Sequence, residues 1–236
     1  MVHECLIIQF AKAPVLGAVK TRLQESSGIP AQAGQAKRRT AEGWPEEREH
    51  QDRVIQLLTA EQSLQLHKAL VQHTLSVLVA CEQATVELWG SDDHPWLHEL
   101  AAQQGVPLAV QQGAELGERM QHALHDGLQR YKKVILVGSD CPGMDADYLT
   151  AAIAALDATP AVIGPAHDGG YVLIGTTTPD IPVFKGMPWG SDSVLQQTCE
   201  RLTAQGVRYT RLAPKHDIDR PADLPHVPER FRPPMA

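Results

Sequence analysis

The stretch VILVGSDCP, residues 134–142, is an apolar run that ends at a carboxylate between small residues. Its first four residues are leucine and β-branched side chains, which predict a buried strand. Pro142 stops the strand, and Gly138 leaves room for a ligand to approach the backbone. Asp140 therefore lies where a strand gives way to a loop. In an open α/β sheet, this edge is where ligands bind.

Strand-like and helix-like segments alternate on both sides of this stretch. The remaining expected strands are 5–10, 85–89, 106–110, 161–164, 171–174 and 207–212. The expected helices are 60–78, 94–104, 116–130, 145–157 and 191–205. Strands separated by helices predict an α/β fold whose mainly parallel central sheet is covered on both faces.

The length of 236 residues and the hydrophobic fraction of 43% suit one α/β domain with a sizeable core. We expect this domain to occupy residues 1–225. A polar stretch at about 24–59 lacks apolar periodicity before its end, which predicts a mobile insertion. We expect residues 226–236 to form a proline-rich C-terminal tail.

Charge and composition exclude several protein classes. The net charge of −7 does not suit a general nucleic-acid binder, which needs clustered cations. No apolar run approaches the roughly 20 residues that a membrane span requires. The four cysteines are scattered without a C-x-x-C pair, so we expect neither a disulfide framework nor a zinc knuckle. A reducing cytoplasm is the expected location.

The loop after the first expected strand concentrates positive charge. Lys12, Lys20 and Arg22 lie on it, with Gly17 between them. Cations and free backbone N–H groups at this edge of a sheet suit a phosphate or diphosphate. The glycine spacing of a Walker P-loop is missing, which excludes that class of ATPase. The alternative interpretation is a solvated basic loop.

Two carboxylate positions suit a metal ion. Mg²⁺ binds oxygen ligands, commonly one or two carboxylates together with substrate phosphates, and Asp140 is well placed for this. Near the C-terminus, the alternation of an extended chain puts Asp217 and Asp219 on the same side and Ile218 on the other, so one of the two carboxylates can reach a metal held by Asp140. Alternatively, Asp140 caps a turn and Asp219 caps the helix that Pro221 begins.

The stretch Asp168-Gly169-Gly170 offers a further carboxylate. Paired glycines permit unusual backbone angles beside Asp168, which can place this side chain against a reacting hydroxyl. The alternative is an Asp-Gly hairpin turn that links two strands.

Two junctions between a loop and a helix add candidate ligand contacts, because helix N-termini attract anions. Their candidate residues are Glu118, Arg119, Trp189 and Asp192. The alternative is that the polar residues cap helices and that Trp189 covers the edge of the core.

Together, the motifs FAKAP (10–14), KTRL (20–23), LGERM (116–120), GSDCP (138–142), GPAHDGGY (164–171) and DIDRPADL (217–224) resemble the DUF2064 family of bacterial GT-A-type transferases. These motifs span nearly the whole chain. The family is similar to the nucleotidyltransferases that make molybdenum-cofactor dinucleotides and to the guanylyltransferase that acts on phospholactate. One departure is His167, where the family usually has an acidic residue.

The resemblance implies a GT-A, Rossmann-like three-layer fold of the nucleotide-diphospho-sugar transferase type. It also implies that Lys12, Lys20 and Arg22 contact donor phosphates. Asp140, with Asp219 as a second ligand, would hold Mg²⁺ or Mn²⁺, and Asp168 would face the acceptor.

The expected function is metal-dependent glycosyl transfer from a nucleotide-sugar to a small-molecule acceptor. The first alternative is nucleotidyl transfer, in which a phosphate or hydroxyl acceptor attacks an NTP and pyrophosphate leaves. Both reactions need the same phosphate loop and metal ligand, so the motifs do not separate them. The second alternative is a nucleotide-binding protein without catalysis. Retention of Lys20, Arg22, Asp140 and Asp168 together counts against it.

Overall fold

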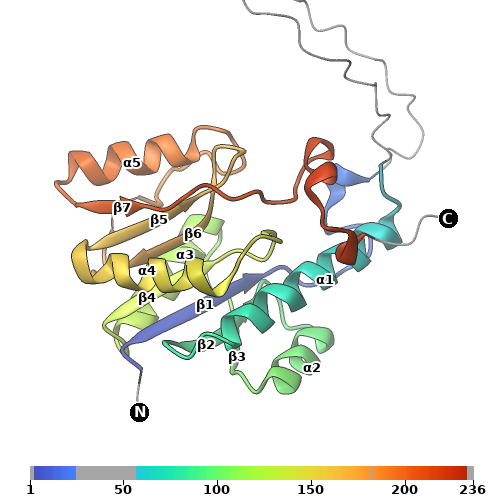
Figure 1. Ribbon diagram of the computed structural model, residues 1–236, viewed down its shortest axis with the longest axis horizontal. Helices are drawn as coiled ribbons and strands as arrows, with labels where there is room; N and C mark the ends of the chain where they lie inside the picture. Colours follow the sequence, from blue (N-terminus) through green and yellow to red (C-terminus); the bar gives the residue numbers. More distant parts are fainter. Residues whose placement is uncertain (1–2, 25–56, 182, 233–236) are drawn as a thin grey trace, which may run out of the picture.

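The structure is a computed structural model that describes residues 3–24, 57–181 and 183–232 (Figure 1). Nearly all of the predicted mobile insertion at 24–59 lies outside the described residues. Within the described part of the chain, no helix is both long enough and apolar enough to cross a bilayer.

Seven strands form one sheet in the order β3-β2-β1-β4-β6-β5-β7. They are β1 (Cys5–Ala11), β2 (Thr85–Gly90), β3 (Leu108–Val110), β4 (Lys133–Val137), β5 (Ala161–Pro165), β6 (Tyr171–Thr176) and β7 (Tyr209–Arg211). All neighbours pair in parallel except β4 with β6 and β5 with β6. This arrangement confirms the predicted mainly parallel sheet.

Strand β6 runs against its neighbours because only a short turn joins it to β5. A parallel crossover needs a dozen or more residues, whereas the turn after Pro165 reaches β6 at Tyr171. Within the turn, Ala166 N donates to Gly170 O. The hairpin interpretation of the Asp168-Gly169 stretch is therefore confirmed.

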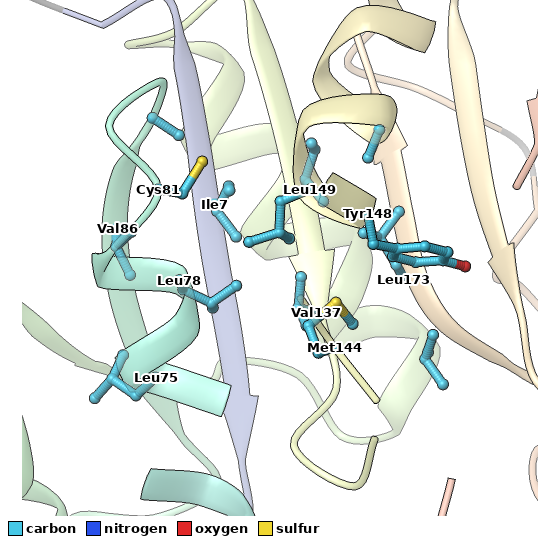
Figure 2. Packing of buried hydrophobic residues seen from close by; sticks show 14 of the residues in the cluster. Ile7, Leu75, Leu78, Cys81, Val86, Val137, Met144, Tyr148, Leu149 and Leu173 are labelled. Carbon is cyan, nitrogen blue, oxygen red and sulfur yellow. The ribbon is translucent and has the colours of Figure 1, made fainter. Parts of the chain in front are cut away.

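In the part of the chain that the structure describes, five α-helices cover the two faces of the sheet: α1 (Ala60–Val79), α2 (Pro95–Gln104), α3 (Leu116–Leu128), α4 (Ala146–Ala158) and α5 (Val194–Ala204). Buried residues of α1, α2 and α4 share one core cluster, part of which is drawn in Figure 2. Buried residues of α3 and α5 belong to the cluster on the opposite face. Alternate residues of β1 enter the two clusters, Ile7 the first and Leu6 and Ile8 the second, as the two-residue period of a strand requires.

The predicted elements and the observed ones differ mainly at their ends. The two strands at the edges of the sheet, β3 and β7, have three residues each and are shorter than predicted. The helix predicted from residue 191 begins at Val194. Gly190 has a φ of 82°, so the chain still turns at this point.

A third cluster fixes the region beyond the carboxyl ends of β1 and β4. It unites Leu23 of the short 3-10 helix η1 (Thr21–Leu23), Leu66 and Leu70 of α1, and Ile218 and Val227 of the C-terminal segment. Figure 1 shows this C-terminal segment, in red, beside the start of α1 and the loop after β1. The segment includes the 3-10 helices η2 (Pro221–His226) and η3 (Glu229–Phe231).

Candidate functional site

Lys12, at the start of the loop after β1, bonds to the backbone further along the same loop. Lys12 Nζ donates to Ala18 O at 2.7 Å, and Ala18 N donates to Val15 O at 3.0 Å. Gly17 lies in this turn with a φ of 73°, and a Cβ added there would meet no atom within 4 Å. Glycine is therefore favoured for its backbone angle rather than for lack of space.

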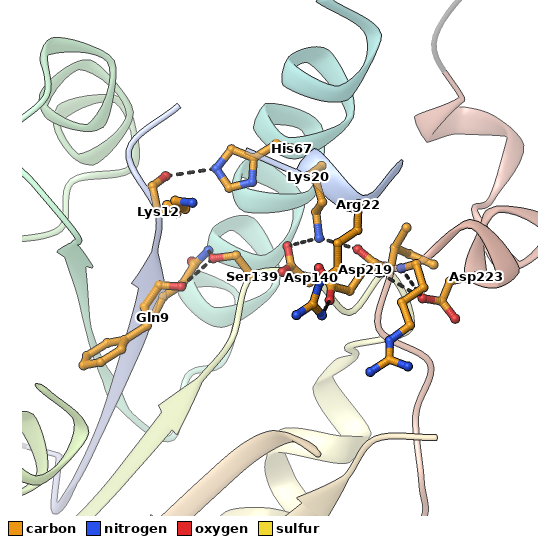
Figure 3. Close-up of polar contacts among 12 residues, drawn as sticks. Gln9, Lys12, Lys20, Arg22, His67, Ser139, Asp140, Asp219 and Asp223 are labelled. Carbon is orange, nitrogen blue, oxygen red and sulfur yellow. Dashed lines mark hydrogen bonds and ion pairs between the residues drawn. The ribbon is translucent and has the colours of Figure 1, made fainter. Parts of the chain in front are cut away.

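Lys20 is the buried cation of the loop. Its side chain is 3% exposed, its Nζ lies 2.7 Å from Asp140 Oδ1, and it also donates to Ile218 O (Figure 3). Lys20 has a φ of 52° and is the one non-glycine residue among those described with a positive φ. Such a backbone conformation costs energy and persists only where the surroundings impose it. The chain thus holds this ammonium group against the carboxylate at the end of β4.

Arg22 is the exposed cation of the loop. Its Nη1 lies 2.6 Å from Asp219 Oδ2, and the arginine side chain is 52% exposed. Asp223 fixes the neighbouring backbone, because its Oδ2 accepts from Asp219 N at 3.0 Å and from Arg220 N at 2.7 Å. Ile218 N donates to Asp140 O at 2.9 Å, which ties this segment to the loop after β4.

These side chains line one cavity of about 150 Å³, the basic pocket. Its lining residues are Lys12, Ala18, Val19, Lys20, Thr21, Arg22, His67, Asp140 and Asp219. The structure therefore brings together the three predicted phosphate-binding cations and the two predicted metal ligands, although these residues come from three distant parts of the chain.

His67 is a member of the basic pocket that sequence reasoning missed. It lies on α1, and its Nε2 is 2.9 Å from Lys12 O. Burial lowers the pKa of His67 below its usual value, so the imidazole is neutral near pH 7. A polar residue beside Leu66 and Leu70 on the apolar face of a predicted helix is the signal that would have identified it.

A second cavity of about 270 Å³, the apolar pocket, lies between the sheet and the helices α3 and α5. The side chains of Phe10, Met120, Tyr171, Trp189 and Val194 line much of it. Trp189 stacks on Phe184 and meets Tyr171 edge-on, with both pairs of ring centroids 6.3 Å apart.

Asp168 and Asp217 line the apolar pocket, and both are carboxylates. Burial, and next the charges of Asp168 and Asp140, raise the pKa of Asp217 to about 7. Gly170 N donates to Asp168 Oδ1 at 2.9 Å, which fixes the orientation of that side chain. Asp217 and Asp219 thus line different pockets on the two sides of the buried Ile218.

The basic and apolar pockets adjoin. Gly138 lines the apolar pocket and Asp140 the basic pocket, and both follow β4 directly. On the other side, Gly190 lines the apolar pocket. A Cβ added to Gly190 would lie 3.3 Å from Arg22 Nη2 of the basic pocket. A ligand in one pocket therefore lies next to a ligand in the other.

Gly169 and Asp192 meet through their backbones. Gly169 has a φ of 92°, and a Cβ added there would lie 2.1 Å from Asp192 O. Gly169 O also accepts from Leu195 N at 2.8 Å, which joins the turn after β5 to the start of α5. This contact explains why the turn requires glycine at position 169.

Glu118 and Arg119 are not brought to either of these pockets. Glu118 Oε2 accepts from Ala114 N at 2.7 Å, and Arg119 Nε donates to Gly113 O at 3.0 Å. Both side chains stabilise the turn before α3. Glu118 lines a separate cavity together with His122 and Lys185.

Comparison with known proteins identifies the family. The family model described as "Uncharacterized protein conserved in bacteria (DUF2064)" matches residues 74–191. No curated protein sequence matches the chain.

Solved structures share the fold. A candidate nucleotide-diphospho-sugar transferase from Desulfovibrio desulfuricans G20 is 28% identical, with a TM-score of 0.73 over 96% of this chain and 87% of that chain. A cytidylyltransferase from Leptospira borgpetersenii serovar Hardjo-bovis is 12% identical, with a TM-score of 0.52 over 92% of this chain and 79% of that chain. A 4-diphosphocytidyl-2C-methyl-D-erythritol synthase is 9% identical, with a TM-score of 0.51 over 95% of this chain and 98% of that chain. The chain thus belongs to the DUF2064 family and has the α/β fold of nucleotide-diphospho-sugar transferases.

Proposed function

We propose that this protein is a metal-dependent transferase that uses a nucleotide-activated donor, and that it transfers a glycosyl group from a nucleotide-sugar to a small-molecule acceptor. The observation that carries the proposal is the basic pocket, where Lys12 and Arg22 lie beside Asp140 and Asp219. The similarity to the candidate nucleotide-diphospho-sugar transferase from D. desulfuricans supports the same activity.

The residues of the basic pocket fit a hard divalent cation. Asp140 and Asp219 offer carboxylate oxygens, the ligands that Mg²⁺ and Mn²⁺ prefer. Among the described residues, no group of three or more His, Cys, Asp or Glu side chains is placed to hold a metal. The pair Asp140 and Asp219 suits the usual Mg²⁺ pattern, in which one or two carboxylates and the substrate phosphates supply the ligands. When bound, the ion would stabilise negative charge on the departing nucleotide.

The two exposed cations suit the donor phosphates. Arg22 and Lys12 can reach a diphosphate in the pocket, and an arginine can form two parallel hydrogen bonds to it. Lys20 is too buried for the same role, with a side chain 3% exposed, and instead positions Asp140. Gly17 keeps the loop tightly turned, although it does not itself line the basic pocket.

Asp168 is the proposed proton acceptor. In the reaction, the acceptor oxygen forms a bond to the anomeric carbon while the bond from that carbon to the diphosphate oxygen breaks. The electron pair of the broken bond leaves with the nucleoside diphosphate. The hydroxyl proton passes to the Asp168 carboxylate, which lines the adjoining pocket.

Nucleotidyl transfer is the second candidate, because the cytidylyltransferase from L. borgpetersenii shares the fold. The basic pocket would then hold the phosphates of an NTP, and pyrophosphate would leave. A nucleotide-binding protein without catalysis would bind the donor in the same place and release nothing.

A screen of NDP-sugars and NTPs with Mg²⁺ or Mn²⁺ tests these functions, with the thermal midpoint as the first readout. A donor that binds only the native state raises this midpoint. Product analysis on the stabilising donors then separates the candidates. Release of nucleoside diphosphate supports glycosyl transfer, and release of pyrophosphate supports nucleotidyl transfer. If no nucleotide raises the midpoint with either metal, the proposed function is wrong.

A further inference from the structure

The lining of the apolar pocket differs sharply in charge from that of the basic pocket. Among the described residues that line the apolar pocket, none is Lys, Arg or His, and the two acidic residues are Asp168 and Asp217. The remaining side chains are mostly apolar or aromatic. The neighbouring basic pocket, in contrast, contains three cations.

A phosphate or carboxylate group would be poorly accommodated in the apolar pocket. It would exchange its water for apolar side chains and would face two carboxylates without a counter-charge from the described lining. An uncharged body would instead gain from burial against Phe10, Tyr171 and Trp189. A hydroxyl on that body can donate a hydrogen bond to a carboxylate.

The position of the pocket relates it to the transfer reaction. Gly190, which lines the apolar pocket, lies beside Arg22 of the basic pocket, and the apolar pocket also contains Asp168, the proposed proton acceptor. We expect a molecule in the apolar pocket to turn its polar end toward Asp168 and the basic pocket and its apolar end toward the aromatic side chains.

We propose that the apolar pocket binds the acceptor, and that the acceptor is an alcohol with a compact apolar body and no phosphate or carboxylate group. The proposal rests on the proposed transferase function and adds the acceptor class to it. The cavity of about 270 Å³ suits a ring with a short side chain. Because the described lining offers no cation, the proposal also favours transfer to a hydroxyl over transfer to a phosphate acceptor.

The test compares 2-phenylethanol with 2-phenylethyl phosphate, which differ by one phosphate group. Binding of each probe is measured by ligand-observed NMR, with Mg²⁺ and pyrophosphate present to occupy the basic pocket. We expect the wild-type protein to bind the alcohol about tenfold more tightly than the phosphate ester. Equal binding, tighter binding of the ester, or no binding of either probe would overturn the proposal.

A charge placed at the rim adds a second readout. Leu116 lines the pocket and is 44% exposed, so Leu116→Lys should fold and bring an ammonium group to the mouth. Val110→Lys is the matched control, because Val110 is 42% exposed and does not line the pocket. Leu116→Lys should tighten binding of the phosphate ester about fivefold, and Val110→Lys should not change it. An equal change in ester binding in both variants would mean that the probes bind outside the apolar pocket, which would overturn the proposal.

Pyrophosphate binding, measured separately by calorimetry with Mg²⁺, distinguishes the two proposals. If pyrophosphate fails to bind while the alcohol preference and the Leu116→Lys effect hold, the donor site of the proposed function is wrong and the uncharged-ligand pocket stands. If pyrophosphate binds and the alcohol preference is absent, the acceptor class is wrong and the donor site stands.

Discussion

At the scale of single residues, charges in the basic pocket are already paired before any ligand arrives. Lys20 pairs with Asp140 and Arg22 with Asp219. The second pair is partly exposed, and such pairs contribute only about 0–1 kcal/mol to stability. Arg22 can therefore leave Asp219 for a phosphate at little cost. Lys20 is held by burial and by Ile218 O, so it remains beside Asp140.

Asp140→Asn tests the metal at this scale. The variant keeps an oxygen beside Lys20 Nζ but removes the charge of the ion pair, so we expect a stability loss of roughly 1–3 kcal/mol and a folded protein. Nucleotide binding that depends on Mn²⁺ should disappear in calorimetric titrations made with and without the metal. An unchanged effect of Mn²⁺ on affinity in the folded variant would show that Asp140 is no metal ligand.

Asp217 makes stability depend on pH. Its pKa is raised from 3.8 to about 7 by burial and by its carboxylate neighbours, so the folded state binds the proton more tightly than the unfolded state. The resulting stabilisation is complete below pH 3.8 and is lost as the pH rises through about 7. Asp217→Asn cannot ionise and avoids this loss.

We therefore compare the free energy of unfolding of Asp217→Asn with that of wild type at two pH values. The difference in favour of the variant should be roughly 1–2 kcal/mol larger at pH 8 than at pH 4. Urea unfolding with a chelator present measures both differences. A stability difference that does not change between the two pH values would contradict the raised pKa of Asp217.

At the scale of elements, two tight contacts position the site. The αL conformation of Lys20 aims its side chain at the end of β4, and the turn after β5 packs against the start of α5. In the second contact, backbone meets backbone at Gly169 and Asp192, so no side chain can move to relieve a clash.

Gly169→Ala should cost more than about 2 kcal/mol, because the new Cβ would overlap Asp192 O at a φ of 92°. Gly206→Ala is the matched control, with a φ of 69° and no atom within 4 Å of the added Cβ. It should cost only about 1 kcal/mol. Equal losses in urea unfolding would mean that the turn adjusts freely and does not fix Asp168.

At the scale of the whole molecule, the sequence predicts the order of strands and helices well, because apolar runs such as 134–137 are separated by amphipathic segments. The motifs also locate the basic pocket, since parallel strands end at one edge of the sheet. The partners within that pocket were not predictable. Lys20 and Asp140 are far apart in the chain, and their ion pair depends on a positive φ that no local pattern specifies.

Two further features lay beyond sequence reasoning for the same kind of reason. His67 joins the site only because α1 packs beside the loop after β1. Asp217 and Asp219 line different pockets because tertiary contacts of Ile218 set the path of this segment. The sequence motif predicted ligand contacts for Glu118 and Arg119. In the structure, their side chains instead bond to the backbone of the turn before α3.

The central claim is that the basic pocket binds the donor diphosphate, and Arg22→Ala tests it most directly. Calorimetry with Mn²⁺ compares a nucleoside diphosphate with its nucleoside, using the base that the donor screen selects. Arg208→Ala is the control, because Arg208 is exposed and lines none of the three cavities described. The account predicts that Arg22→Ala weakens diphosphate binding about tenfold or more and leaves nucleoside binding unchanged. Equal loss for both ligands, or no loss for either, would contradict it.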